Sequence, residues 1–254
     1  MSTVKSKDGT LIAYEKAGSG PPLVLVDGAL CSRQFGPMPK LAPLLASRFT
    51  VYWYDRRGRG ESGDTRPYAR EREIEDVAAL IQAAGGSAFV VGLSSGAALA
   101  LEAAASGLPV TKVAAYEPPY MPGGANHQAR LSELIEAGRR GDAVKYFMRD
   151  MVGMPGFVIV LMQLMFWVWP KLKAVAHTLP YDAAVMGDYQ VPAARFAAIR
   201  APALVMHGSK TDPRLMKAAR SVAEAVPHAQ HRVLEGQTHN VGPQVLAAAL
   251  FDFA

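Results

Sequence analysis

The chain has 254 residues, of which half are hydrophobic and 19% are charged, and its formal net charge at pH 7 is +5. This length and composition suit one large folded unit with a sizeable core. The charge is too scattered for a nucleic-acid-binding surface, so we expect no nucleic-acid partner. A single cysteine, Cys31, excludes an internal disulfide, and no C-x-x-C or His-rich spacing indicates a metal site.

The N-terminal residues lack the apolar segment of a secretory signal, and with the lone cysteine this predicts a cytoplasmic protein. The most apolar run, residues 157–169, is too short to span a bilayer as a helix. We therefore expect no stable membrane insertion, and contact of this run with a lipid surface is the lesser alternative.

Eight short runs rich in apolar and β-branched residues are predicted to be strands. Residues 4–7 and 11–17 flank Asp8-Gly9 and are expected to form an antiparallel hairpin with a two-residue connection. The other strands are expected at residues 23–26, 49–54, 89–91, 111–116, 203–206 and 231–234.

Helical patterns follow most of these strands. In residues 71–84, Ile74, Val77 and Ile81 fall on one helical face. Further helices are expected at residues 38–47, 97–105, 213–225 and 241–253. The alternation predicts an α/β fold with a mostly parallel eight-stranded sheet, helices on both faces, and reactive groups at the carboxyl ends of the strands.

A small-residue turn follows the strand at residues 89–91. The sequence Gly92-Leu93-Ser94-Ser95-Gly96 fits G-x-S-x-G and runs into a helix. In such an elbow the serine is strained, and both glycines are required because side chains there would collide with the adjoining strand and helix. Only one register fits, so Ser94 is the candidate nucleophile; the plain alternative is an ordinary tight turn.

A serine nucleophile needs a general base, and that base needs an orienting carboxylate. His239 is the only histidine in a loop that follows the final strand, so it is the candidate base. Two carboxylates follow strands, namely Asp212 and Glu117. Asp212 is the first choice because the order Ser94, Asp212, His239 matches that of known hydrolase elbows. Glu117 is the alternative acid, and Asp212 also suits the cap of a helix beginning at Pro213. The histidines set aside are His127, His177, His207, His228 and His231.

With these residues the sequence resembles a serine hydrolase of the α/β-hydrolase superfamily over essentially its whole length. The elbow, the turn from His207-Gly208 to Asp212, and Asp55-x-Arg57-Gly58-x-Gly60-x-Ser62 carry the resemblance. The last motif is similar to a loop of the esterase, perhydrolase and lactonase branch. The resemblance implies a hydrolase core of residues 1–120 and 191–254, with a helical cap inserted at residues 121–190.

The resemblance also implies an oxyanion hole made by two backbone N–H groups. One belongs to Ser95, which follows the nucleophile, and the other to the loop at Asp27-Gly28, where Ala29 is the expected donor and Leu30 the fallback. Relatives usually carry His-Gly where this chain has Asp27-Gly28. A carboxylate there would oppose the charge that develops in catalysis, so we expect Asp27 to turn away or to be neutralised.

Arg57 is the expected partner that neutralises Asp27, and the plain alternative is that Arg57 only shapes its turn. Cys31 beside this loop is expected to be a buried structural cysteine rather than a nucleophile.

The predicted cap is unusually apolar, and we expect most of its large side chains to be core and a minority to line a pocket above Ser94. These side chains are Met148, Met151, Met154, Phe157, Met162, Met165, Phe166, Trp167 and Trp169. The sequence predicts a cofactor-free serine esterase, without a metal, that acts on small esters with an apolar acyl or aromatic group through an acyl-enzyme. The alternatives are a lactonase, a thioesterase, a C–C hydrolase, a perhydrolase, or a non-enzymatic ligand receptor. The oligomeric state is not indicated.

Overall fold

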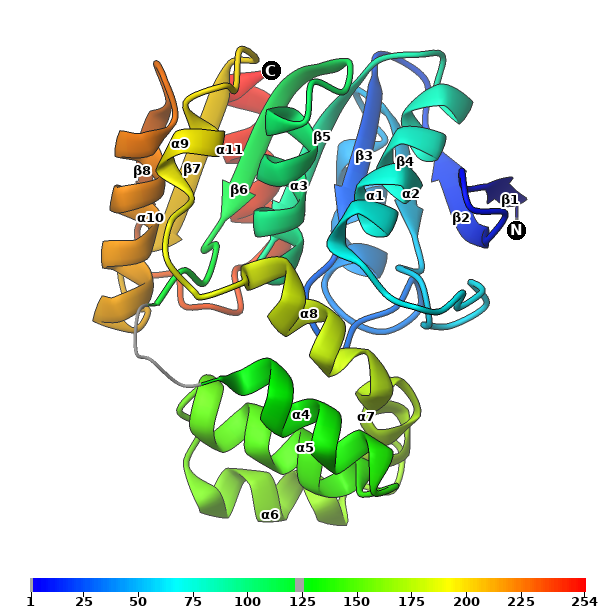
Figure 1. Cartoon of the computed structure of the whole chain (residues 1–254). Coiled ribbons are helices and arrows are strands. Elements are labelled where there is room, and N and C mark those ends of the chain that lie inside the picture. The colour runs from blue at the N-terminus through cyan, green and yellow to red at the C-terminus, as the bar shows by residue number, and fades with distance from the viewer. Residues whose placement is uncertain (1, 122–125) are drawn as a thin grey trace.

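The computed structural model describes residues 2–121 and 126–254, and it contains one eight-stranded sheet with flanking helices (Figure 1). The strands are β1 (Ser2–Lys5), β2 (Leu11–Ala17), β3 (Pro22–Val26), β4 (Thr50–Tyr54), β5 (Ala88–Leu93), β6 (Val110–Tyr116), β7 (Ala203–Gly208) and β8 (Gln230–Leu234). Their order across the sheet is β1-β2-β4-β3-β5-β6-β7-β8. β2 pairs antiparallel with β1 and β4, and all other pairs are parallel. The predicted mostly parallel α/β sheet is confirmed.

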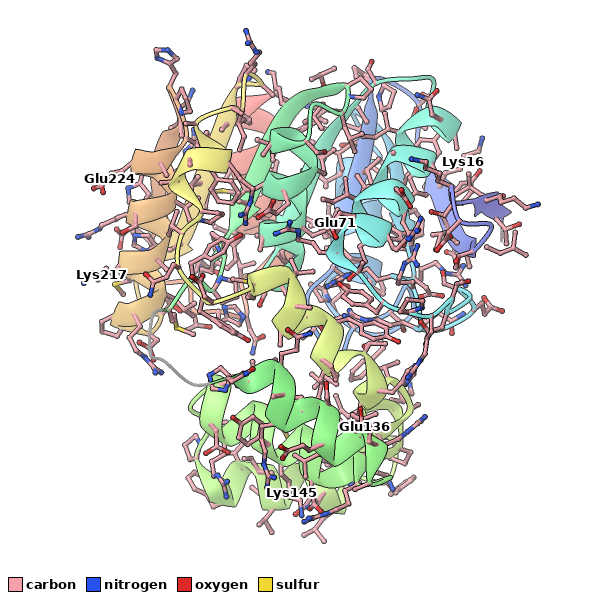
Figure 2. The ribbon with its side chains drawn as sticks, in the orientation of Figure 1. Lys16, Glu71, Glu136, Lys145, Lys217 and Glu224 are labelled. Carbon is pink, nitrogen blue, oxygen red and sulfur yellow. The ribbon has the colours of Figure 1, made fainter. Side chains whose placement is uncertain are left out.

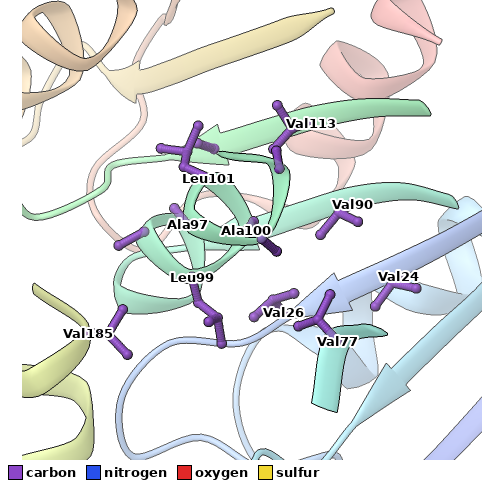
Figure 3. Packing of buried hydrophobic residues seen from close by; sticks show 14 of the residues in the cluster. Val24, Val26, Val77, Val90, Ala97, Leu99, Ala100, Leu101, Val113 and Val185 are labelled. Carbon is purple, nitrogen blue, oxygen red and sulfur yellow. The ribbon is translucent and has the colours of Figure 1, made fainter. Parts of the chain in front are cut away.

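Alternate side chains of the central strands enter two separate cores, as the two-residue period of a strand requires. Val24 and Val26 of β3 pack under α2, α3 and α10, in the core that Figure 3 shows. Leu23 and Leu25 pack on the opposite face under α1 and α11. These helices are α1 (Met38–Leu45), α2 (Arg70–Ala83), α3 (Ser95–Ala105), α10 (Pro213–Ala225) and α11 (Pro243–Phe253). Both faces of the sheet are therefore covered, which explains the continuous apolar strands in the sequence.

The N-terminal hairpin has a longer connection than the predicted two residues. The Ser6 N–H donates to the Thr10 carbonyl at 2.8 Å, and the Gly9 N–H donates to the Ser6 carbonyl at 2.9 Å. Asp8 accepts from the Thr10 N–H at 3.0 Å and also forms an ion pair with Arg57 at 2.9 Å. β1 therefore ends at Lys5 and not at Lys7, and the loop after it contacts the buried Arg57 through Asp8.

A helical segment connects β6 to β7. Its elements are α4 (His127–Glu136), α5 (Arg140–Tyr146), the π-helix η1 (Phe147–Met151), α6 (Gly156–Leu164), α7 (Trp169–Val175), the 3₁₀ helix η2 (Ala176–Thr178), α8 (Leu179–Met186) and α9 (Ala193–Phe196). α4 to α7 lie at one end of the sheet (Figure 1) and share an apolar core that includes Leu131, Val144 and Ile159. α8 runs back toward the sheet and contacts both α3 and α4. It therefore joins this segment to the helix that follows Ser94.

Charged side chains cover most of the outer helices, such as Glu136 on α4 and Lys217 and Glu224 on α10 (Figure 2). α6 and the turn after it differ, because they expose large apolar side chains: Phe157, Val160, Leu161, Leu164, Phe166 and Trp167. Within the described residues, no single helix has the length and apolarity to cross a bilayer. One pair, residues 156–164 with 169–186, meets those criteria only in combination, and it is bent by 101°.

Candidate active site

Ser94 lies at a sharp turn between β5 and α3. Its backbone has φ 55° and ψ −125°, a conformation that costs energy in any residue other than glycine. A Cβ on Gly92 would lie 2.2 Å from the Gly96 carbonyl oxygen, and a Cβ on Gly96 would lie 2.3 Å from that of Val26. Both glycines are therefore required by close packing, as the elbow pattern predicts.

His239 lies in the loop after β8, and its ring is held by Glu117. The His239 Nδ1 to Glu117 Oε2 distance is 2.6 Å. Glu117 follows β6 directly, has φ 49°, and is fully buried. It also accepts hydrogen bonds from the Gly208 N–H at 2.8 Å and the Thr211 hydroxyl at 3.0 Å. Burial alone would raise the pKa of Glu117, but these hydrogen bonds, that of His239 first, outweigh it and lower the pKa.

Asp212, the first-choice acid from the sequence, is used elsewhere. Its carboxylate caps α10 by accepting from the Arg214 N–H at 2.8 Å, and it forms an ion pair with the Arg214 side chain at 2.7 Å. The predicted hydrogen bond from His239 to Asp212 is instead made to the alternative acid, Glu117. The reason is that β6 neighbours β5 in the sheet, so its end lies beside Ser94, whereas Asp212 begins a helix.

A cavity of about 470 Å³ contains the predicted reactive groups. Ser94, Ser95, Ala29 and His239 all line it, and Asp212 lies in its wall with Arg214. Its apolar lining comes from Pro119, Met121, Phe147, Met151, Val152, Met186 and Leu215. Its other polar side chains include His127, Asp150 and Lys210, so the cavity lining contains both apolar and polar groups.

Of the large apolar side chains expected in the cap, only Met151 lines this cavity. Met148 is buried in the core of α4 to α7, with Met154, Met162 and Trp169 packed against that core. Phe157, Phe166 and Trp167 are exposed, contrary to the expectation that such residues are core.

The two expected oxyanion donors come from different segments that meet at Ser94. A Cβ on Gly28 would lie 3.1 Å from Ser94 Cβ, so the loop after β3 packs directly against Ser94. Within residues 2–121 and 126–254, neither the Ala29 N–H nor the Ser95 N–H donates a hydrogen bond to a protein acceptor. Leu30, the fallback donor, has a buried side chain that belongs to the apolar core of α4 to α7.

The model of the Alpha/beta hydrolase family matches residues 19–252 of the chain. The chain belongs to this family. An alpha/beta hydrolase from Sphaerobacter thermophilus DSM 20745 is 54% identical to it over 99% of both chains, with a TM-score of 0.92. This confirms the resemblance drawn from the elbow and loop motifs.

More distant solved structures share the fold of this hydrolase. The enol-lactonase from Burkholderia xenovorans LB400 is 21% identical over 99% of both chains, with a TM-score of 0.76. A thermophilic esterase from Thermogutta terrifontis is 19% identical over 99% of this chain and 97% of its own, with a TM-score of 0.72. Comparison with curated protein sequences gives no match.

Asp27 of the hydrolase is buried at the start of the loop after β3, and Arg57 does not neutralise it. Asp27 Oδ1 accepts from the Gly28 N–H at 2.8 Å, whereas Oδ2 has no hydrogen-bond partner among the described residues. Burial raises the pKa of Asp27 to about 7. Arg57 pairs instead with Asp76 at 2.7 Å and with Asp8 at 2.9 Å, so the predicted Asp27–Arg57 pair is wrong. Arg57 ties α2 to the N-terminal hairpin.

Cys31 is half-buried, and its thiol contacts the Ala29 carbonyl at 3.3 Å. Burial and the neighbouring Asp27 carboxyl raise the pKa of Cys31 well above its usual range. The thiol is therefore protonated at neutral pH, which disfavours a nucleophilic role.

Sequence reasoning missed a buried charged cluster at the elbow, formed by Arg56, Arg59 and Asp182. Arg56 donates two hydrogen bonds to Glu73, at 2.6 and 2.7 Å, and one to Asp182 at 2.7 Å. The short run of arginines after β4 was the only feature of the sequence that indicated this cluster, because Asp182 lies over a hundred residues from them in the chain. Among the described residues, no group of three or more His, Cys, Asp or Glu side chains is arranged to hold a metal ion.

Proposed function

We propose that the hydrolase cleaves carboxylic esters through a triad of Ser94, His239 and Glu117. The observation that carries the proposal is the 2.6 Å contact between His239 Nδ1 and the buried Glu117 carboxylate, at a cavity that also contains the strained Ser94. With Nδ1 held by a carboxylate, the imidazole presents Nε2 as the proton acceptor.

The proposed reaction assigns one step to each of these groups. Ser94 Oγ attacks the ester carbonyl while His239 Nε2 takes its proton, and Glu117 stabilises the imidazolium that forms. The Ala29 and Ser95 N–H groups stabilise the tetrahedral oxyanion, at about 3 to 4 kcal/mol for each donor. His239 then protonates the leaving alcohol, and water releases the acid from the acyl-enzyme by the same steps.

The apolar side chains in the cavity lining support an ester with an uncharged acyl or aromatic group as the substrate. Met151 and Met186 have flexible thioether side chains that fit irregular apolar groups. The cavity volume of about 470 Å³ suits a small organic molecule rather than a polymer.

A p-nitrophenyl ester series of increasing acyl length tests this function. We expect Ser94→Ala and His239→Ala each to lower kcat by at least about a thousandfold. Ser106→Ala is the matched control, because Ser106 lies at the opposite end of α3, and we expect its turnover to stay within twofold of wild type.

Unimpaired turnover by Ser94→Ala would exclude the nucleophile. Faster turnover of lactones or thioesters than of matched esters would keep the nucleophile but reject the ester substrate. A preference for short, charged acyl groups would contradict the proposal that the apolar lining of the cavity binds the acyl group.

A further inference from the structure

The Gly28–Ala29 peptide is fixed by a buried guanidinium group. Arg59 Nη1 donates to the Gly28 carbonyl oxygen at 2.5 Å, and the Arg59 side chain is about 1% exposed. In a trans peptide the carbonyl and the following N–H point in opposite directions. The Ala29 N–H therefore points away from Arg59, and Ala29 itself lines the cavity that contains Ser94.

Arg59 is in turn held by the helical segment. Its Nη2 donates to Asp182 Oδ2 at 2.7 Å, and its Nε donates to the Thr178 hydroxyl at 3.1 Å. With the bond to Gly28, all three nitrogens of the guanidinium donate a hydrogen bond. The planar fork leaves Arg59 little freedom, so the direction of the Gly28 carbonyl is fixed as well.

The second oxyanion donor is tied to the same carboxylate. The Ser95 hydroxyl donates to Asp182 Oδ1 at 2.7 Å, and Arg56 donates to that oxygen at the same distance. Asp182 is 3% exposed and lies on α8, outside the sheet. The buried Asp182 carboxylate therefore contacts Ser95 directly and contacts the Gly28–Ala29 peptide through Arg59.

The Arg59 charge lies on the carbonyl side of the Gly28–Ala29 peptide, and Asp182 and Glu73 balance the two arginines of the cluster. Burial alone would raise the pKa of Asp182, but the two arginines and the Ser95 hydroxyl lower it, so the carboxylate stays ionised. A positive guanidinium on the Gly28 carbonyl withdraws electron density through the peptide, which makes the Ala29 N–H a stronger donor.

We propose that Arg59 and Asp182 are positioning residues that set the direction and donor strength of the Ala29 N–H and hold it in register with the Ser95 N–H. The proposal rests on the proposed function, because it assigns both N–H groups to the oxyanion of ester cleavage. It gives a role in catalysis to α8, which lies outside the sheet that carries Ser94, Glu117 and His239.

Arg59→Met tests the proposal, because it keeps the unbranched stem of the side chain and removes its donors. We expect kcat for a p-nitrophenyl ester to fall by about 10- to 100-fold with KM within about threefold, since the oxyanion forms only after binding. The affinity for a trifluoromethyl ketone, which forms a tetrahedral oxyanion on Ser94, falls by a similar factor. Arg59→Lys keeps the charge and restores part of kcat.

Arg57→Met is the matched control. Arg57 is equally buried and forms a two-bond ion pair with Asp76, but it makes no hydrogen bond to the loop at residues 27–30. We expect this variant to lose stability while kcat stays within about threefold of wild type. If Arg59→Met does not fold, Asp182→Asn replaces it, because asparagine keeps the shape and removes the charge that orients Arg59.

Crystal structures of the variants show the direction of the Gly28–Ala29 peptide independently of any activity measurement. A rotated Gly28–Ala29 peptide in Arg59→Met, and an unrotated one in Arg57→Met, support the proposal. An unrotated peptide with unchanged kcat in Arg59→Met overturns it, as does an equal loss of kcat in both variants. If Ser94→Ala retains full turnover, the proposed function fails, and the direction of the peptide still decides whether Arg59 positions it.

Discussion

The helical segment between β6 and β7 has two contrasting ends. Its inner end, α8, buries an ionised Asp182 against Arg56 and Arg59 beside the nucleophile. Its outer end, α6, exposes Phe157, which is 69% exposed, and other large apolar groups. The core that α4 to α7 share is apolar as usual, so the two unusual features are a buried ion-pair cluster at one end and an exposed apolar face at the other. The contrast teaches that this protein buries its arginines in ion pairs, as it also does with Arg57 and Asp76.

The largest expected effect concerns the buried Glu117 and the half-buried Asp212. We expect Glu117→Gln to lower kcat by about 10³- to 10⁴-fold, because the neutral amide no longer stabilises the His239 imidazolium. Asp212→Asn, at the surface pair with Arg214, is expected to stay within about threefold. Steady-state kinetics on one ester measures both, and the opposite ranking would return the role of the acid to Asp212.

Loss of a buried arginine from the inner end is the next effect in size. Arg56→Met leaves Glu73 without its ion pair and removes one of the two charges on Asp182. We expect the free energy of unfolding to fall by about 3 to 5 kcal/mol, as for other broken buried pairs. Urea unfolding measures this loss, and a loss below about 1 kcal/mol would show that the cluster adds little to stability.

The pH dependence of stability tests the effect of the buried Asp27 carboxyl. Because its folded pKa is about 7 and its usual value is 3.8, the folded state binds more protons than the unfolded state between these values. Stability therefore falls as the pH rises from about 4 to 7, and the penalty is complete above pH 7. We expect Asp27→Asn to raise the melting temperature by several degrees at pH 8 and by less at pH 5. An equal effect at both pH values would contradict a buried, titrating carboxyl.

The smallest effect is expected at the outer end. Val160 on α6 is 55% exposed, and we expect Val160→Ala to change the free energy of unfolding by less than about 0.5 kcal/mol. Its neighbour Ile159 is 4% exposed and is the matched control, where truncation to alanine costs about 2 to 5 kcal/mol. A large loss in Val160→Ala would mean that the outer face of α6 is covered in solution.

Much of the sheet could be predicted because parallel strands that are buried on both faces leave continuous apolar runs. The candidate nucleophile and base were found by the same logic, since Ser94 and His239 each follow a strand. The acid was harder to place. β7 continues through His207 to Gly208, so the predicted turn is part of a strand, and Asp212 falls at the start of a helix. The extension of β7 depends on pairing with β8, and nothing in the sequence around residue 207 indicates it.

The charged cluster at the elbow could not be predicted for a different reason. Arg56, Arg59 and Asp182 are brought together only when α8 packs against α3, and no period or motif relates residues so far apart in the chain. The exposed face of α6 was missed because an apolar run alone does not show which side of a helix is covered.

The first helix of the segment, α4, begins ten residues after Glu117, and the segment contacts the buried arginines through Thr178 of η2 and Asp182 of α8. In the proposed mechanism, helices α4 to α7 supply no member of the triad and neither oxyanion donor, so a chimaera can replace them if the new helices again cover Leu30, whose side chain lies in their core. The splice points of such a chimaera are set by Asp182, because a graft that discards it also removes the anchor of Arg59.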